Sequence, residues 1–175
     1  MRIGITERGD GGLDQSWRSA LSRGLVDGAI IITKAPHLLL LKQDLPDNTV
    51  VHCTITGLGG SPIEPGVIEP KAALAAYSTL ARKYGDDRVV LRVDPIFPWE
   101  PYLSKALEVI KHWESRVRIS YLDMYSHTRR RLEKVGVEIP SGLYNGLHAD
   151  FETRCKIGEK IAKITLGEFE ICGEP

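Results

Sequence analysis

The sequence has no long hydrophobic run and no apolar leader. Its apolar runs are short, as at 38–41, and are far too short to span a bilayer. The N-terminus passes directly into a strand-like segment, without the apolar region of a secretory signal. We therefore expect a cytoplasmic protein without a membrane partner.

Cysteine is scarce, and the residues Cys53, Cys155 and Cys172 lie far apart in the chain. An odd number of widely spaced cysteines fits reduced thiols better than a disulfide framework. Strand and helix periodicity place Cys53 and Cys155 on core faces, where cysteine behaves as a small apolar residue. No metal site is predicted from these residues, and Cys172 is the one candidate thiolate.

The chain also lacks an excess of charge, since 23 basic residues balance 23 acidic ones. A broad electrostatic attraction to nucleic acid is therefore not supported. A local basic face, formed by Arg129, Arg130, Arg131 and Lys134 on an expected helix, leaves a phosphate or nucleic-acid contact open there. The alternative is an ordinary solvated surface.

What the sequence does contain is a regular alternation of strand and helix patterns over 175 residues. This length suits one sizeable core, so we expect a single domain over 1–175. Strands are expected at 2–7, 29–34, 50–56, 88–94, 117–123 and 168–172. Helices are expected at 13–22, from about 70, around 103–110, at about 126–134 and at about 150–164. Such alternation predicts a parallel sheet.

Two strands are polar on one side only. The third expected strand alternates His52 and Thr54 with apolar residues, and the fourth places Arg92 and Asp94 in the same way. Central strands of a flat sheet covered on both faces would be apolar on both sides. We therefore predict an α/β fold of the partial (β/α)6, TIM-like barrel type, with a polar lumen.

Polar residues also gather where the expected strands end, which is where barrels of this type place their sites. They are Glu7, Arg8, Asp10, Lys34, Thr54, Thr56, Gly57, Arg92, Asp94, Asp123, Tyr125 and Glu174, with Glu64 in the loop after the third strand. Charged groups are costly to bury unless they are paired. The set therefore predicts either a ligand site or a salt-bridge network that closes the barrel.

Lys34, Arg92, Asp94 and Asp123 are the catalytic candidates of this set. Lys34 could form a Schiff base, contact a ligand or pair with Asp94 or Glu64. Arg92 could hold a carboxylate or phosphate through two hydrogen bonds, with Asp94 or Glu7 as a base. These alternatives stay open at this point.

Four ordered segments resemble a known family. They read VDGAIIITKAP at 26–36, TITG at 54–57 followed by IEPGV at 63–67, RVVLRVDPI at 88–96 and ISYLDMY at 119–125. In this order they resemble the domain-of-unknown-function 1848 family of bacteria and phages, which is related to radical-SAM barrels and spore photoproduct lyase-like proteins. The resemblance implies a six-stranded partial barrel.

The same resemblance implies S-adenosylmethionine (SAM) and a 4Fe–4S cluster held by cysteines after the last strand. This sequence has only Cys172 at that place and ends at Pro175. A cluster needs several thiolates within a short run. The chain is therefore expected to be truncated, to be a short form without the cluster, or to be completed by another chain.

Three functions follow from this reading. The first is a radical-SAM-like barrel that binds a small polar or nucleotide-containing ligand at the strand ends and is catalytically incomplete without the cluster. The second is a cluster-free lyase or hydrolase that uses Lys34, Arg92 and Asp94. The third is a ligand- or partner-binding module without chemistry. Because an open barrel exposes sheet edges, a homodimer is also expected.

Overall fold

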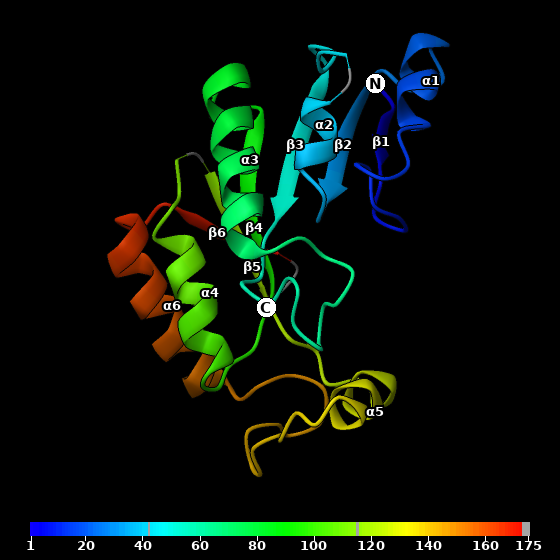
Figure 1. Cartoon of the computed structure of the whole chain (residues 1–175). Coiled ribbons are helices and arrows are strands. Elements are labelled where there is room, and N and C mark those ends of the chain that lie inside the picture. The colour runs from blue at the N-terminus through cyan, green and yellow to red at the C-terminus, as the bar shows by residue number, and fades with distance from the viewer. Residues whose placement is uncertain (42, 115, 173–175) are drawn as a thin grey trace.

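The computed structural model describes residues 1–41, 43–114 and 116–172 and contains one six-stranded sheet (Figure 1). Its strands are β1 (Ile3–Ile5), β2 (Gly28–Thr33), β3 (Thr49–Thr54), β4 (Val89–Ile96), β5 (Arg116–Tyr121) and β6 (Phe169–Ile171). Every neighbouring pair is parallel, and the order in space is the order in the chain. The predicted strands are confirmed, with ends that differ by one or two residues.

Six helices lie between and around the strands. They are α1 (Trp17–Ser22), α2 (His37–Leu40), α3 (Pro70–Tyr84), α4 (Tyr102–Ile110), α5 (Ser126–Lys134) and α6 (Phe151–Thr165). The short α2 was not predicted, because four residues carry too little periodicity to be recognised. The first predicted helix begins later than expected, at Trp17, since the chain before it forms turns.

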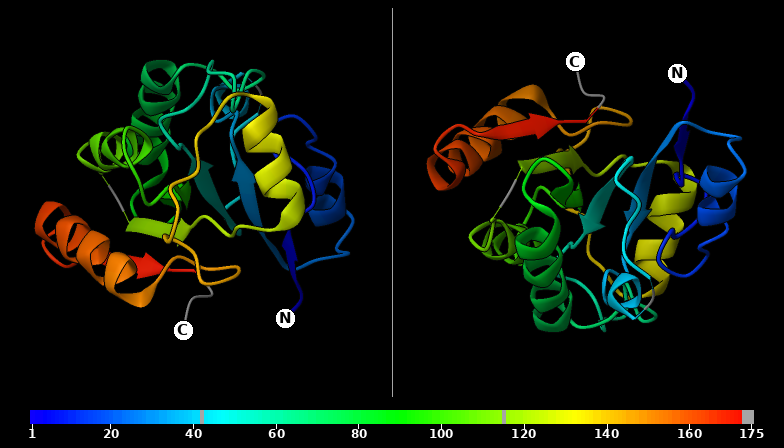
Figure 2. Two further views of the ribbon diagram at one scale, coloured as in Figure 1. Left: turned by 90° about the horizontal axis from the view of Figure 1, so that it is seen from below. Right: turned by 90° about the horizontal axis from the view of Figure 1, so that it is seen from above.

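The strand order explains the curvature of the sheet. Parallel strands joined by crossovers of one hand place all their helices on one side, unless the order reverses as in a doubly wound sheet. No reversal occurs among these strands. Figure 2 shows the strands as an open arc with most helices outside it, while α5 lies beyond the strand ends, as Figure 1 also shows. The fold is therefore an α/β half-barrel of the partial TIM type.

The two faces of the sheet differ as the alternation predicts. Ile31, Val51 and Leu91 point outward and are fully buried in the core beneath the helices. His52 and Arg92, on the opposite face of their strands, line a cavity inside the arc. The polar lumen is therefore set by the period-two pattern of the strands.

One helix face differs from its prediction. In α6, Phe151 and Cys155 are exposed, whereas Ile157 and Ile161 are buried. This helix packs on α4 and on the edge strand β6, so only a narrow stripe with a spacing of four residues is covered. The expectation that Cys155 is a core residue is wrong for this reason, while Cys53 is buried as expected.

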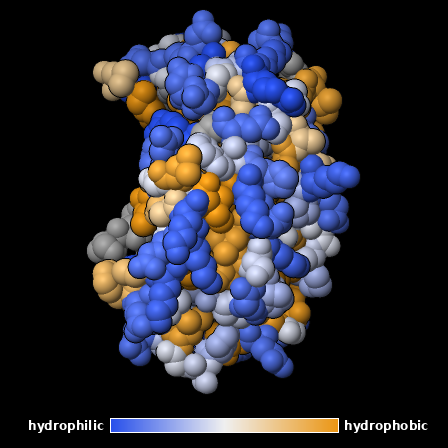
Figure 3. Space-filling view, turned by 90° about the vertical axis from the view of Figure 1, so that its left-hand side faces the viewer, coloured by the Kyte–Doolittle hydropathy of each residue, from blue (hydrophilic) through white to orange (hydrophobic). Residues whose placement is uncertain are grey.

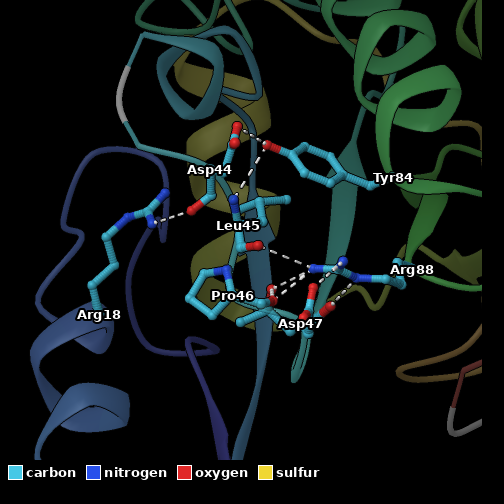
Figure 4. Close-up of polar contacts among 8 residues, drawn as sticks. Arg18, Asp44, Leu45, Pro46, Asp47, Tyr84 and Arg88 are labelled. Atoms are coloured by element: carbon cyan, nitrogen blue, oxygen red, sulfur yellow. Dashed lines mark hydrogen bonds and ion pairs between the residues drawn. The ribbon is translucent and has the colours of Figure 1, made fainter.

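A polar network ties the loop before β3 to its neighbours (Figure 4). Arg18 of α1 donates a hydrogen bond to the carbonyl of Asp44 at 3.0 Å. The Tyr84 hydroxyl donates to the Asp44 carboxylate at 3.1 Å and accepts from the amide of Leu45 at 3.2 Å. Arg88 donates to the carbonyl of Leu45 at 3.4 Å. The loop thereby links α1, α3 and the start of β4.

The outer surface is largely polar. Figure 3 views the side on which α4 and α6 lie, where hydrophilic residues dominate and hydrophobic ones show in a strip between them. Within the described ranges, no helix is long and apolar enough to cross a bilayer.

Candidate ligand site at the mouth of the half-barrel

A cavity of about 340 Å³ opens at the C-terminal ends of β1 to β4. We call it the mouth cavity. Its lining includes Glu7, Arg8, Asp10, Lys34, Thr54, Arg92 and Asp94, all of them site candidates from the sequence, together with Gly9, Ile32 and Thr33. Parallel strands with equivalent ends bring these distant residues to one edge of the sheet.

Asp10 organises the rim of the mouth cavity. Its carboxylate accepts hydrogen bonds from the Thr33 hydroxyl at 2.6 Å and from the backbone amides of Lys34 at 2.7 Å and Gly12 at 2.9 Å. These bonds fasten the loop after β1 to the end of β2. Because both carboxylate oxygens are engaged, Asp10 shapes the site and has little capacity left for a ligand.

Lys34 pairs with Glu64, which was one of the alternatives left open by the sequence. Its ammonium forms an ion pair with one oxygen of the Glu64 carboxylate, and the Thr56 hydroxyl donates to the other at 2.6 Å. The Glu64 side chain is 10% exposed and that of Lys34 35%. The loop after β3 is thereby tied to Lys34 at the end of β2.

Arg92 and Asp94 lie two residues apart on β4, on the same face, and form an ion pair. This pair leaves a donor unused, since the Arg92 Nε is buried and has no hydrogen-bond partner among the described residues. The hydroxyl of Thr54, on β3, is also buried and has no hydrogen-bond partner among the described residues. Both residues line the mouth cavity. Unsatisfied buried polar atoms are costly, so they mark a place where water or a ligand belongs.

A smaller cavity of about 130 Å³ lies deeper in the lumen. His52, Arg118 and Cys172 line it, and it shares Arg92 and Glu7 with the mouth cavity. Burial is the main cause that lowers the pKa of His52 to about 4, and the cationic Arg118 and Arg92 act in the same direction. His52 is therefore a neutral imidazole at physiological pH.

Arg118 and its neighbour Arg116 were missed by the sequence analysis. Both lie on β5 and pair with Glu170 on β6, and Arg118 lines the deeper cavity. The hydrogen bond from Arg116 is the main cause that lowers the pKa of the Glu170 carboxyl. Their signal was the alternation of Arg116 and Arg118 with the buried Val117 and Ile119, the same pattern that identified β3 and β4.

The remaining candidates lie outside the mouth cavity. Asp123 contacts Nδ1 of His148 at 2.8 Å, and Tyr125 stacks on His127 with ring centroids 5.4 Å apart. Gly57 packs closely against the backbone of Lys105 in α4. Glu174 lies outside the described residues. His148 was missed because it lies in a loop, where no local pattern points to Asp123.

The residues do not fit an iron–sulfur cluster. The buried Cys53 faces the helices, and burial raises the pKa of its thiol. Cys155 is exposed on α6, and Cys172 lies by the lumen. In the part of the chain that the structure describes, no group of three or more His, Cys, Asp or Glu residues could hold a metal ion. No reaction step through a cluster is therefore assigned to these residues.

The fold and the mouth cavity together define an open α/β half-barrel with a polar pocket at the C-terminal strand ends. A family model described as a domain of unknown function (DUF1848) matches residues 12–173. The chain therefore belongs to the DUF1848 family, as the four sequence segments indicated. No curated protein and no solved structure matches the chain.

Proposed function

We propose that this protein binds a small polar ligand in the mouth cavity, with Arg92 and Thr54 as its main contacts. The observation that carries the proposal is that Arg92 and Thr54, which both line the mouth cavity, each hold a buried polar atom, Nε and Oγ1, without a partner among the described residues. A ligand carboxylate would accept from Arg92 and from the Thr54 hydroxyl. The volume of about 340 Å³ lies within the range of small-molecule sites.

The charges around the mouth cavity favour a zwitterionic ligand. Three acidic residues, Glu7, Asp10 and Asp94, are balanced by the basic Arg8, Lys34 and Arg92. A polyanion would meet carboxylates of its own sign on this lining, which opposes its binding. An amino acid, or a nucleoside that carries an amino-acid group, presents both charges and matches this balance. SAM, the ligand implied by the family resemblance, is one member of that class.

The proposal is limited to binding. Radical cleavage of SAM needs a reduced iron–sulfur cluster, and the described cysteines are not arranged to hold one. The radical-SAM-like reading is thus supported by the barrel and by the zwitterion-matched cavity, but these residues assign it no chemistry.

Calorimetric titration with SAM, methionine and methylthioadenosine tests the proposal. SAM and methionine carry the amino-acid group, and methylthioadenosine lacks it. We expect Arg92→Lys to weaken binding of the first two about tenfold, because lysine keeps the charge but lacks Nε. The exposed Arg130→Lys is the matched control and should bind as wild type does. Equal affinity in Arg92→Lys and Arg130→Lys, or no binding of either amino-acid ligand, would contradict the proposal.

A hydrolase that uses Asp123 and His148, and not the Lys34, Arg92 and Asp94 of the sequence-based alternative, is the second candidate, favoured by the 2.8 Å contact between the two residues. A carboxylate that orients an imidazole is the arrangement of a general base. Hydrolysis of p-nitrophenyl acetate by wild type should then fall at least about tenfold in His148→Gln. It should persist in His127→Gln, which removes an exposed histidine outside this pair. Equal rates in the two variants would remove this candidate.

A further inference from the structure

A second cavity, of about 490 Å³, lies beside the mouth cavity and runs along α5. We call it the α5 cavity. Lys34 lines both cavities, so the Lys34–Glu64 ion pair stands at their boundary. Neither Arg92 nor Thr54 lines the α5 cavity, and a ligand there would not need the contacts proposed for the mouth.

The floor of the α5 cavity is apolar. Phe97 from the segment after β4, Leu122 from the end of β5 and Leu132 from α5 form it, and all three are buried in one cluster. Ile63 and Val135 extend the apolar lining at its sides. A surface of this kind favours a hydrophobic ligand body, because binding removes apolar area from water.

One face of α5 supplies polar groups to the same cavity. His127, Arg131 and Lys134 line it, and their spacing of four and three residues places them on one side of the helix. Arg129 and Arg130, which do not line the cavity, lie elsewhere on the helix surface and are exposed. The basic run of the sequence is thus divided between a cavity wall and a solvated surface.

The cations of this wall are uncompensated. The side chains of Arg131 and Lys134 have no ion pair or hydrogen-bond partner in the ranges that the structure describes. Among the described residues, Glu64 is the only carboxylate on the lining, and it is engaged by Lys34 and Thr56. Two free cations beside an apolar floor attract an anionic group whose carrier is itself apolar.

We propose that the α5 cavity binds a small organic anion with an apolar, ring-sized body. Its carboxylate, phosphate or sulfonate lies between Arg131 and Lys134, and its body packs on Phe97, Leu122 and Leu132. The volume of about 490 Å³ accommodates a fused two-ring compound within the usual range of such sites. This inference goes beyond the ligand proposed for the mouth, which is zwitterionic and polar.

The test uses 2-naphthoate and 2-naphthamide, which share one body and differ in charge, with binding followed by fluorescence titration. In wild type the acid should bind about tenfold more tightly than the amide, as expected for a charge-assisted contact. In the double variant Arg131→Gln/Lys134→Gln this preference should disappear. The matched double variant Arg129→Gln/Arg130→Gln has the same net charge as the first double variant and should keep the preference for the acid.

Any one of three results would overturn the inference. Absence of naphthoate binding at millimolar concentration, equal affinity for acid and amide in wild type, or an equal loss of preference in both double variants would do so. All four substituted side chains are exposed, so both variants should melt as wild type does. Because neither Arg131 nor Lys134 lines the mouth cavity, a failure of naphthoate binding here is distinct from a failure of SAM or methionine binding at the mouth.

Discussion

Thr54 and Arg92 are register partners on the adjacent parallel strands β3 and β4. Each carries a buried polar atom without a partner within the described chain, and both line the mouth cavity. A folded core avoids such atoms unless something else satisfies them. Their coincidence at one position of the sheet is therefore the main structural observation behind the ligand site proposed for the mouth cavity.

Replacement of Thr54 by Val should separate stability from binding. Valine keeps the shape of threonine and removes an unsatisfied hydroxyl, so the free energy of unfolding should stay equal or rise by up to about 1 kcal/mol. Ligand affinity at the mouth should fall. Thr33→Val is the control, because its hydroxyl donates to Asp10 at 2.6 Å and accepts from Ala35 at 2.8 Å. It should cost about 1–3 kcal/mol. Urea unfolding measures the free energy of unfolding of the two variants. A Thr54→Val variant that is as destabilised as Thr33→Val would contradict the assignment of an unsatisfied hydroxyl to Thr54.

His52 should make stability depend on pH. Its pKa is lowered to about 4 in the folded protein from an ordinary value of 6.5, so the unfolded state binds the proton more tightly. The stabilisation is complete above pH 6.5 and is lost as the pH falls toward 4, by at most about 3 kcal/mol. Wild type should therefore lose more stability than His52→Gln between pH 7 and pH 5. If urea unfolding shows that wild type and His52→Gln lose equal stability between pH 7 and pH 5, His52 does not contribute to the pH dependence of stability.

Glu64→Gln should destabilise the chain by about 1–2 kcal/mol, because the half-buried Lys34 loses its counter-charge and Thr56 its charged acceptor. Glu108→Gln is the matched change, since Glu108 and Lys111 form an exposed pair at 2.7 Å. Such surface pairs contribute little, so its effect should stay within about 0.5 kcal/mol. Thermal unfolding compares the two variants, and equal shifts would contradict a special role for Glu64.

The three thiols should differ in reactivity. Cys155 and Cys172 are exposed, whereas Cys53 is fully buried, with a thiol whose pKa is raised by burial. Because the thiolate is the reactive form, a disulfide reagent should titrate two thiols in the native protein and the third only after denaturation. Cys53→Ala is the control, and it should show two reactive thiols in the native state and no further thiol after denaturation. A third fast thiol in native wild type would mean that Cys53 is accessible.

Arg88→Ala should cost about 2 kcal/mol of stability. The guanidinium donates to the carbonyls of Pro46 at 2.6 Å and Thr49 at 3.2 Å, and so fastens the loop that leads into β3 (Figure 4). Arg130→Ala removes an exposed arginine without such contacts and should change stability by less than about 0.5 kcal/mol. Urea unfolding distinguishes them, and equal midpoints would show that these contacts are replaceable.

The half-barrel was predictable because its signals are local. The alternation of Val51, Cys53 and Ile55 with polar residues is a property of one strand, and it identified the lumen face that the structure confirms. The inward face of α6 was not predictable in the same way. Cys155 fits a helical apolar stripe in the sequence, yet only packing on α4 and β6 decides which stripe is covered.

The sequence by itself determined the parallel half-barrel, the family and the candidates at its strand ends, since each depends on periodicity or on residues close in the chain. Only the tertiary structure decided which candidates act together. It paired Lys34 with Glu64, engaged Asp10 with backbone amides, and left Arg92 Nε and Thr54 Oγ1 unsatisfied. It also divided the basic run of α5 between a cavity and solvent. Such outcomes depend on distances between segments far apart in the chain, and no local pattern encodes those distances.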